Sequence, residues 1–128
     1  EKNRSLHNNG GGWAATVDDS SALLYVTGMW SLDIFDLRTG QHLERHRTGF
    51  GARAPFISSM HARIIIPMTL EGSIRTYNRD TLELESVYPV GLGVRNLFIT
   101  EDEAILIGTN AGGTYYWDTE NFLETNQP

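Results

Sequence analysis

Several ordinary features of folded proteins are missing from this sequence, and each absence narrows what the protein can be. Its 128 residues include no cysteine, which excludes disulfide bonds, thiolate metal sites and cysteine nucleophiles. No stretch approaches the roughly 18 consecutive apolar residues that a membrane-spanning helix needs. Basic residues are in the minority, and the net charge is −6. We therefore expect neither nucleic-acid binding nor membrane insertion, because binding to phosphates relies on positive charge.

Motifs for catalysis or cofactor binding are also scarce. Gly10–Gly12 is not followed by Lys-Ser/Thr or a helical pattern, so it does not match a phosphate-binding loop. The acidic residues Asp18–Asp19 and Glu101–Glu103 fall in predicted turns, where we interpret them as solvated turn residues. His42 and His46 lie about 13 Å apart along a predicted strand, too far to share a metal. The sequence predicts no cofactor and no metal site, and it favours a non-enzymatic role.

The sequence does contain a repeat. Asp36, Asn78 and Asp118 occupy equivalent positions, 42 and 40 residues apart, at the ends of similar apolar strands. A repeat near this length, built from short strands, is typical of β-propeller blades. The thirteen glycines and the period-two alternation of apolar residues agree with a turn-rich all-β protein. We predict an all-β fold of four-stranded antiparallel β-propeller blades, with three blades in this chain.

Each repeat divides into four predicted strands, and no segment shows helical periodicity. The first strands are expected at 14–18, 54–58 and 96–100, the second at 22–27, 62–67 and 104–109, the third at 31–37, 73–79 and 113–118, and the fourth at 42–47, 83–88 and 122–125. The sequence predicts a single domain over 1–128, with blades at about 8–47, 48–88 and 90–128. Residues 1–7 are interpreted as an extra outer strand.

Three blades are too few to close a ring, since propellers have roughly four to eight. An open arc would leave an apolar sheet face in water. The sequence therefore predicts a protein partner: either a second copy, giving a two-fold dimer with a six-bladed ring, or the remaining blades of a longer chain. The strand at residues 1–7 would help to close such a ring. The chain begins at Glu1 and not at Met, so we expect it to be processed or trimmed.

The loops that lead into the innermost strands hold the first candidate site. Arg53 and Arg95 end two matching segments, Gly49–Arg53 and Gly91–Arg95, and Trp13 takes the same place in the first repeat. We expect all three at the rim of the central channel. Arginine suits carboxylate or phosphate groups and tryptophan offers a stacking face, so a small anion or a carbohydrate is a candidate ligand. The alternative is that these residues pair with acidic loops or hold blades together.

A second candidate is the loop between the second and third strands of each repeat. Trp30, Met68 and Leu70 are apolar residues where loops are usually polar, which indicates a partner or ligand contact. Packing between adjacent blades is the alternative. The aromatic segment Tyr115–Trp117 alternates between the two faces of a predicted strand, so we interpret it as blade packing and not as one stacking platform.

Residues 12–125 resemble the YVTN-type propeller repeat of YncE-like and surface-layer-like proteins. The resemblance rests on Tyr25-Val26-Thr27, on the strand exits Asp36–Gly40 and Asp80–Leu82, and on the entry Val90-Gly91. Such proteins usually have seven blades, whereas this chain has three repeats. The resemblance implies a cell-surface, periplasmic or secreted protein. Trp117-Asp118 also matches the WD dipeptide of WD40 repeats, but the accompanying Gly-His pair is missing.

We expect a non-enzymatic binding or assembly module that recognises a ligand or a protein partner through its channel-rim loops. One alternative is a sugar-binding lectin formed by oligomerised few-blade chains, to which Trp13 and Trp30 would contribute. Another is a fragment of a lactonase-like propeller enzyme, which the resemblance implies would hold a metal at the channel. Arg53 and Arg95 stand where that metal would need acidic, amide or histidine ligands, which disfavours the enzyme.

Overall fold

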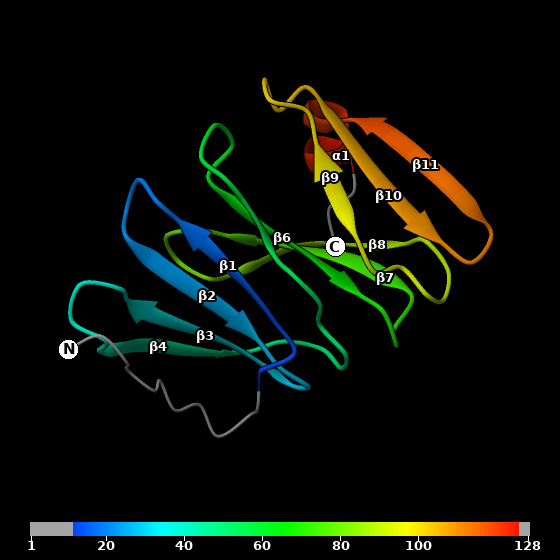
Figure 1. Ribbon diagram of the computed structural model, residues 1–128. Helices are drawn as coiled ribbons and strands as arrows, with labels where there is room; N and C mark the ends of the chain where they lie inside the picture. Colours follow the sequence, from blue (N-terminus) through cyan, green and yellow to red (C-terminus); the bar gives the residue numbers. More distant parts are fainter. Residues whose placement is uncertain (1–11, 126–128) are drawn as a thin grey trace.

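The computed structural model describes residues 12–125, which form three antiparallel sheets and one short helix (Figure 1). The first sheet contains β1 (Ala14–Asp18), β2 (Leu23–Thr27), β3 (Ser31–Asp36) and β4 (His42–Arg47). The second contains β5 (Phe56–Ser58), β6 (Arg63–Met68), β7 (Ser73–Asn78) and β8 (Leu84–Pro89). The third contains β9 (Leu97–Ile99), β10 (Ile105–Asn110) and β11 (Gly113–Asp118), followed by α1 (Thr119–Thr125).

Within each sheet the strands lie in chain order, so every connection inside a sheet is a hairpin. The predicted division into three repeated sheets is confirmed, and strand bounds agree to within two residues for the first eleven strands. Even an irregularity is repeated, because the register shifts between Ile34 and Phe35 on β3 and between the equivalent Thr76 and Tyr77 on β7. The strand expected for residues 1–7 lies outside the described residues.

The predicted fourth strand at 122–125 is wrong, because these residues belong to helix α1, and among residues 12–125 the third sheet has three strands. The Asp118 carboxylate accepts a hydrogen bond from the Asn121 backbone N–H, the usual arrangement at a helix N-terminus. Phe122 and Leu123 are buried between the second and third sheets. Four residues are too few for periodicity to distinguish a strand from a helix, so the cap at Asp118 was the only available signal.

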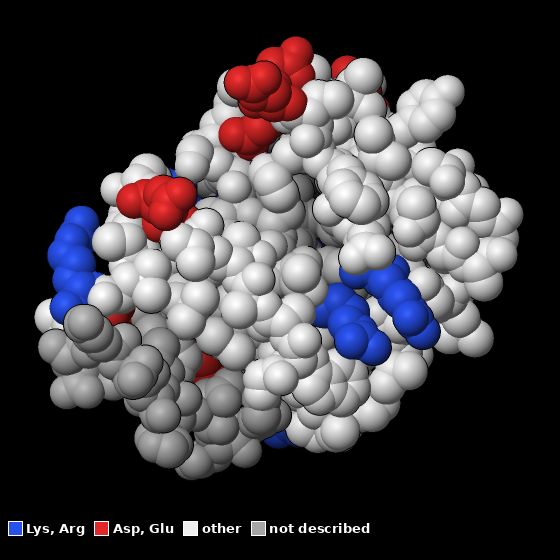
Figure 2. Space-filling view, in the orientation of Figure 1, with Lys and Arg blue, Asp and Glu red and all other residues white. Residues whose placement is uncertain are grey.

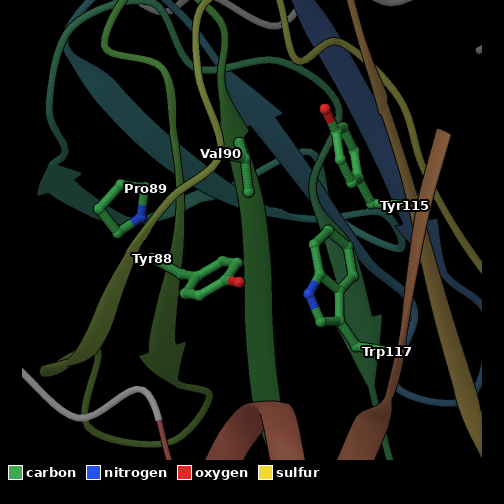
Figure 3. A pocket seen from close by; sticks show the side chains of 5 residues that line it. All are labelled: Tyr88, Pro89, Val90, Tyr115 and Trp117. Carbon is green, nitrogen blue, oxygen red and sulfur yellow. The ribbon is translucent and has the colours of Figure 1, made fainter. Parts of the chain in front are cut away.

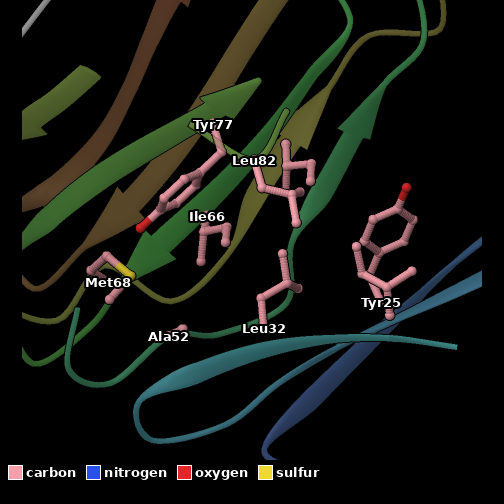
Figure 4. Close-up of a cluster of buried hydrophobic side chains, with 9 residues drawn as sticks. Tyr25, Leu32, Ala52, Ile66, Met68, Tyr77 and Leu82 are labelled. Carbon is pink, nitrogen blue, oxygen red and sulfur yellow. The ribbon is translucent and has the colours of Figure 1, made fainter. Parts of the chain in front are cut away.

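The second sheet lies between the other two, and its two faces form two hydrophobic cores. One face packs on the first sheet through the cluster shown in Figure 4, which includes Tyr25, Leu32, Ile66 and Tyr77. The other face packs on the third sheet. The residues of that second cluster are Ile65, Ile74, Val94, Leu106, Phe122 and Leu123. The middle sheet is therefore covered on both faces, while each end sheet has one face turned away from its neighbours.

Side-chain hydrogen bonds also join the sheets. The Thr16 hydroxyl donates to the Pro55 carbonyl at 2.6 Å, which links the first sheet to the second. The Ser58 hydroxyl donates to the Glu103 carboxylate, which links the second sheet to the third. These bonds lie near the innermost strands and fix how adjacent sheets are placed, which in turn positions the loops at the sheet ends.

Candidate functional site

The two matching loops Gly49–Arg53 and Gly91–Arg95 share a central glycine with positive φ, although Gly91 also has a positive φ and its equivalent Gly49 does not. Gly51 and Gly93 have φ values of +84° and +88°, a conformation that residues with a side chain rarely adopt. Each loop is held by a threonine of the preceding sheet. The Thr27 hydroxyl donates to the Arg53 carbonyl at 2.9 Å, and the Thr69 hydroxyl donates to the Val94 carbonyl at 2.5 Å. The loops therefore repeat the central glycine and a threonine contact, but the two threonines bond to carbonyls at non-equivalent positions.

Two of the three predicted rim residues come together. The Arg53 guanidinium lies 5.2 Å from the centre of the Trp13 ring, within the range of a cation–π contact. The Arg53 Nε atom is buried and has no hydrogen-bond partner among the described residues. Arg95 is exposed and no described contact joins it to this pair. Figure 2 shows basic side chains close together on this face, near the beginning of β9.

The second predicted loop site divides into exposed and buried members. Trp30 and Leu70 are 49% and 50% exposed, and Phe50 contacts Trp30 with ring centres 4.6 Å apart and ring planes tilted by 42°. The loop that carries Phe50 bonds to both neighbours: the Gly51 N–H donates to the Met29 carbonyl, and the Gly51 carbonyl accepts from the Thr69 N–H. Trp30, Phe50 and Leu70 are thus apolar residues on adjoining loops.

Met68 is the exception, and its prediction as a partner contact is wrong. It is the last residue of β6 and is fully buried in the first core cluster (Figure 4). A long, flexible side chain suits such a position, where it fills the space between two sheets. Packing between blades, the alternative considered for this loop, therefore describes Met68.

Sequence reasoning expected an apolar sheet face to remain uncovered but did not say which residues would form it, and one such face is the outer face of the third sheet. Phe98 and Tyr116 both pair with Ile107, on opposite sides of β10, so these three side chains share one face of the sheet. Ile105 lies on the same face, two residues before Ile107. The exposed fractions are 56% for Phe98, 43% for Ile105 and 75% for Tyr116. We call these four residues the terminal face.

The equivalent faces of the other two sheets are buried. Ile107 and Tyr116 are paired on β10 and β11, as Tyr25 and Ile34 are paired on β2 and β3. Tyr25 is 2% and Ile34 7% exposed, because this face of the first sheet packs on the second. In the second sheet the corresponding residue is Ile65, which is fully buried against the third. The terminal face therefore has the composition of a face that is covered in both other sheets.

Charge is unevenly placed. In the view of Figure 2 the surface over β10 and β11 carries no charged side chain, whereas acidic residues gather at the turns. In one such turn, hydrogen bonds from the Ser21 and Ser20 hydroxyls lower the pKa of Asp18. In the equivalent turn, hydrogen bonds from the Thr100 hydroxyl and the Ala104 N–H lower the pKa of Asp102. These acids cap turns, as the sequence predicted.

The sequence also gave no reason to expect a buried carboxylate on β3. Asp33 has no exposed side-chain surface and accepts hydrogen bonds from Arg45 Nε and Nη2 at 2.8 and 3.3 Å. His42 Nε2 lies 2.8 Å from the same carboxylate. The hydrogen bond that Arg45 donates to the Asp33 carboxylate raises the pKa of Arg45. The cluster joins β3 to β4. Among residues 12–125 no group of three or more His, Asp or Glu side chains is arranged to hold a metal.

A slot of about 210 Å³ opens between the second and third sheets. Its lining residues are Tyr88, Pro89, Val90, Tyr115 and Trp117 (Figure 3). The rings of Tyr115 and Trp117 are nearly parallel, at 22° with centres 6.4 Å apart, and Tyr88 meets Trp117 edge-on at 5.7 Å. Tyr115 and Trp117 therefore share one face of β11, and only Tyr116 points to the other face. The expected alternation of Tyr115–Trp117 between the two faces is confirmed, and the three rings do not form one platform.

No protein-family model and no curated protein matches this chain. Solved structures do match. One is Kuenenia stuttgartiensis hydrazine synthase, with a TM-score of 0.73 at 18% identity, covering 84% of this chain and 34% of that chain. Another is KlHsv2 with loop 6CD replaced by a Gly-Ser linker, with a TM-score of 0.66 at 11% identity, covering 91% and 38%. The chain thus spans about a third of the length of these structures.

At these identities the matches show the fold alone. The chain has a β-propeller-like fold, as its three consecutive antiparallel sheets and these neighbours indicate. No helix in the described part of the chain is both long and apolar enough to cross a bilayer.

Proposed function

We propose that this chain is a non-enzymatic assembly and binding module, in which the terminal face receives a further propeller sheet. The observation that carries this proposal is the exposure of the terminal face while the equivalent faces of the other two sheets are buried. The neighbouring sheet is the first sheet of a second copy, joined head to tail. Two copies would give six sheets in a closed ring. The kinship of the repeat with the YVTN type is part of this proposal.

The size of the exposed surface supports an assembly. A phenylalanine or tyrosine side chain presents about 200 Å², so Phe98 and Tyr116 together expose roughly 260 Å² of mainly apolar area. Covering it would contribute about 6 kcal/mol per junction at 25 cal/mol per Å², as an upper limit because tyrosine keeps a polar hydroxyl. A ring of two copies has two such junctions, so together they would contribute about 12 kcal/mol toward the roughly 4–15 kcal/mol that association costs in lost free motion.

Head-to-tail joining is favoured because it repeats a geometry that the chain already contains twice. The face of the first sheet that bears Tyr25 and Ile34 packs on the second sheet, and the face of the second sheet that bears Ile65 packs on the third. At the far end, Val17 on β1 is 49% exposed on the opposite face of the first sheet. A junction from the third sheet to another first sheet would cover both ends at once. A ring of two copies has two such junctions.

The dimer is tested by measuring the mass of the protein in solution by light scattering after size-exclusion chromatography. We expect a mass near twice the 14.3 kDa of the chain, and a monomer for Phe98→Asp, because the junction would bury the new charge. Met60→Asp is the control, since Met60 is 64% exposed on the turn before β6 and lies outside the terminal face. A wild-type chain that is folded by circular dichroism but monomeric contradicts the proposal.

A second function, recognition of a small anion or an acidic sugar at the rim, rests on the Arg53–Trp13 pair. The guanidinium stacks on the ring and its Nε donor has no described partner. Arginine binds carboxylates through two parallel hydrogen bonds while an aromatic ring packs on sugar C–H groups. Titration with glucuronate and with glucose distinguishes recognition of the carboxylate from packing on the sugar ring alone. Binding of glucuronate that Arg53→Met abolishes supports the site, and equal binding to the variant refutes it.

A further inference from the structure

The outer edge of the third sheet is open in a way that the other two sheets are not. In the first two sheets, β4 and β8 pair with the third strand of each sheet. In the third sheet, no described strand pairs with the outer side of β11. Five of its six residues, from Gly113 to Tyr116 and Asp118, are exposed. Helix α1 follows β11 but contributes no strand.

The direction of the free hydrogen-bonding groups follows from the alternation of an antiparallel ladder. The Thr119 N–H donates to the Ala104 carbonyl, in register with the β10–β11 pairs. Residues 113, 115 and 117 of β11 therefore bond to β10, and Thr114 and Tyr116 direct their backbone groups to the open edge. The second sheet shows the same alternation at its outer edge. There the Val90 N–H donates to the Gly72 carbonyl, so two residues later the backbone groups of Ile74 also point toward β8. Ile74 is the equivalent of Thr114.

The aromatic slot adjoins this edge and has a counterpart in the second sheet. Tyr115, which lines the slot, is equivalent to Arg75 on β7. Arg75 is paired with Val87 of β8, a half-buried aliphatic residue. A strand added to β11 in the same register would place its own residue opposite Tyr115, on the face that bears the slot. Tyr88 and Pro89 of β8 and the following Val90 form the other wall.

From these features we propose that the edge of β11 and the slot together form an acceptor site for an extended peptide strand. The strand pairs antiparallel with β11 through Thr114 and Tyr116 and inserts an aliphatic side chain opposite Tyr115. Backbone hydrogen bonds supply affinity in this mode of recognition, and the slot supplies specificity. The site deepens the proposed assembly function, because a partner polypeptide would complete the third sheet, but it is separate from the terminal face.

The chain offers its own probe, a synthetic peptide with the sequence of residues 83–90, which forms the fourth strand of the second sheet. The labelled peptide is titrated with the Phe98→Asp chain, which cannot assemble through the terminal face, and binding is followed by fluorescence anisotropy. Each further substitution is made in this Phe98→Asp chain. We expect saturable binding that weakens about tenfold in Thr114→Pro, which removes an edge N–H, and about tenfold in Tyr115→Ala, which removes a wall of the slot. A peptide with Val87→Asp should bind comparably weakly. Met60→Ala is the control and should leave binding unchanged.

The outcomes separate this site from the assembly itself. Loss of peptide binding in Thr114→Pro, with the fold retained by circular dichroism, supports the acceptor site whether or not the wild-type chain dimerises. Equal binding to wild type, Thr114→Pro and Tyr115→Ala overturns it, as does the absence of binding at roughly millimolar peptide, the weak end for specific recognition. A monomeric wild-type chain that still binds the peptide refutes the dimer alone.

Discussion

The pair Ile65 and Ile107 tests how completely the terminal face is covered. These residues occupy equivalent places on β6 and β10, but Ile65 is fully buried against the third sheet and Ile107 is only half-buried. Ile65→Ala leaves a cavity in a closed core and should reduce the free energy of unfolding by about 3 kcal/mol at any protein concentration. In a single chain Ile107→Ala removes carbons that already contact water, and about 1 kcal/mol is expected.

Assembly should change the stability cost of Ile107→Ala and leave the cost of Ile65→Ala unchanged. If a neighbouring sheet covers the terminal face, Ile107 becomes a core residue and its substitution should approach the cost of Ile65→Ala. Urea unfolding followed by circular dichroism, at roughly 1 µM and 100 µM chain, measures both variants against wild type. We expect the Ile107→Ala cost to rise with concentration and the Ile65→Ala cost to stay constant. A small cost for Ile107→Ala at both concentrations would refute the reasoning.

Three further predictions concern the loops and turns. Gly51→Ala should lower stability by about 1–3 kcal/mol in thermal unfolding, because φ is +84° and the new Cβ would lie 2.9 Å from Leu70; an unchanged melting temperature would show that the loop adapts. Thr27→Val should cost about 1–2 kcal/mol in urea unfolding, since the Arg53 carbonyl loses its donor, and a neutral result would mean that water replaces it. The pKa of Asp18 is lowered in the folded chain, so its contribution to stability is present above about pH 4 and is lost as the pH falls through the folded pKa. Asp18→Asn should therefore make the fall of the melting temperature in acid shallower. Identical pH profiles for the variant and the wild type would show that the Asp18 carboxylate does not stabilise the turn.

The strands and turns could be read from the sequence because each depends on neighbouring residues. Apolar runs such as Arg63–Met68 favour strands, and acidic turns such as Asp18–Ser21 close hairpins by local hydrogen bonds. The repeat added the strand order, since each hairpin connects neighbours. Helix α1 was missed because its preference is decided by Phe122 and Leu123 entering the space between two sheets, which is a tertiary contact.

The candidate site was predicted in part. The matching loops led us to expect Trp13, Arg53 and Arg95 at one rim, and the structure brings Arg53 and Trp13 into contact without Arg95; their role in ligand binding stays a prediction. Met68 and Leu70, two residues apart, show the limit of this reasoning: one is fully buried and the other half-exposed. Apolar character alone does not say which side of a loop faces the core, since that depends on where the adjacent sheet lies.

The sequence by itself determined that this protein is a series of short antiparallel strands in three repeats, since periodicity and turn chemistry are local properties. Only the tertiary structure decided which surfaces remain uncovered. Phe98, Ile107 and Tyr116 have the same apolar character as residues that the first and second sheets bury, and no local pattern distinguishes them. Their exposure follows from position at the end of the stack, because a sheet face is buried only where another sheet packs on it.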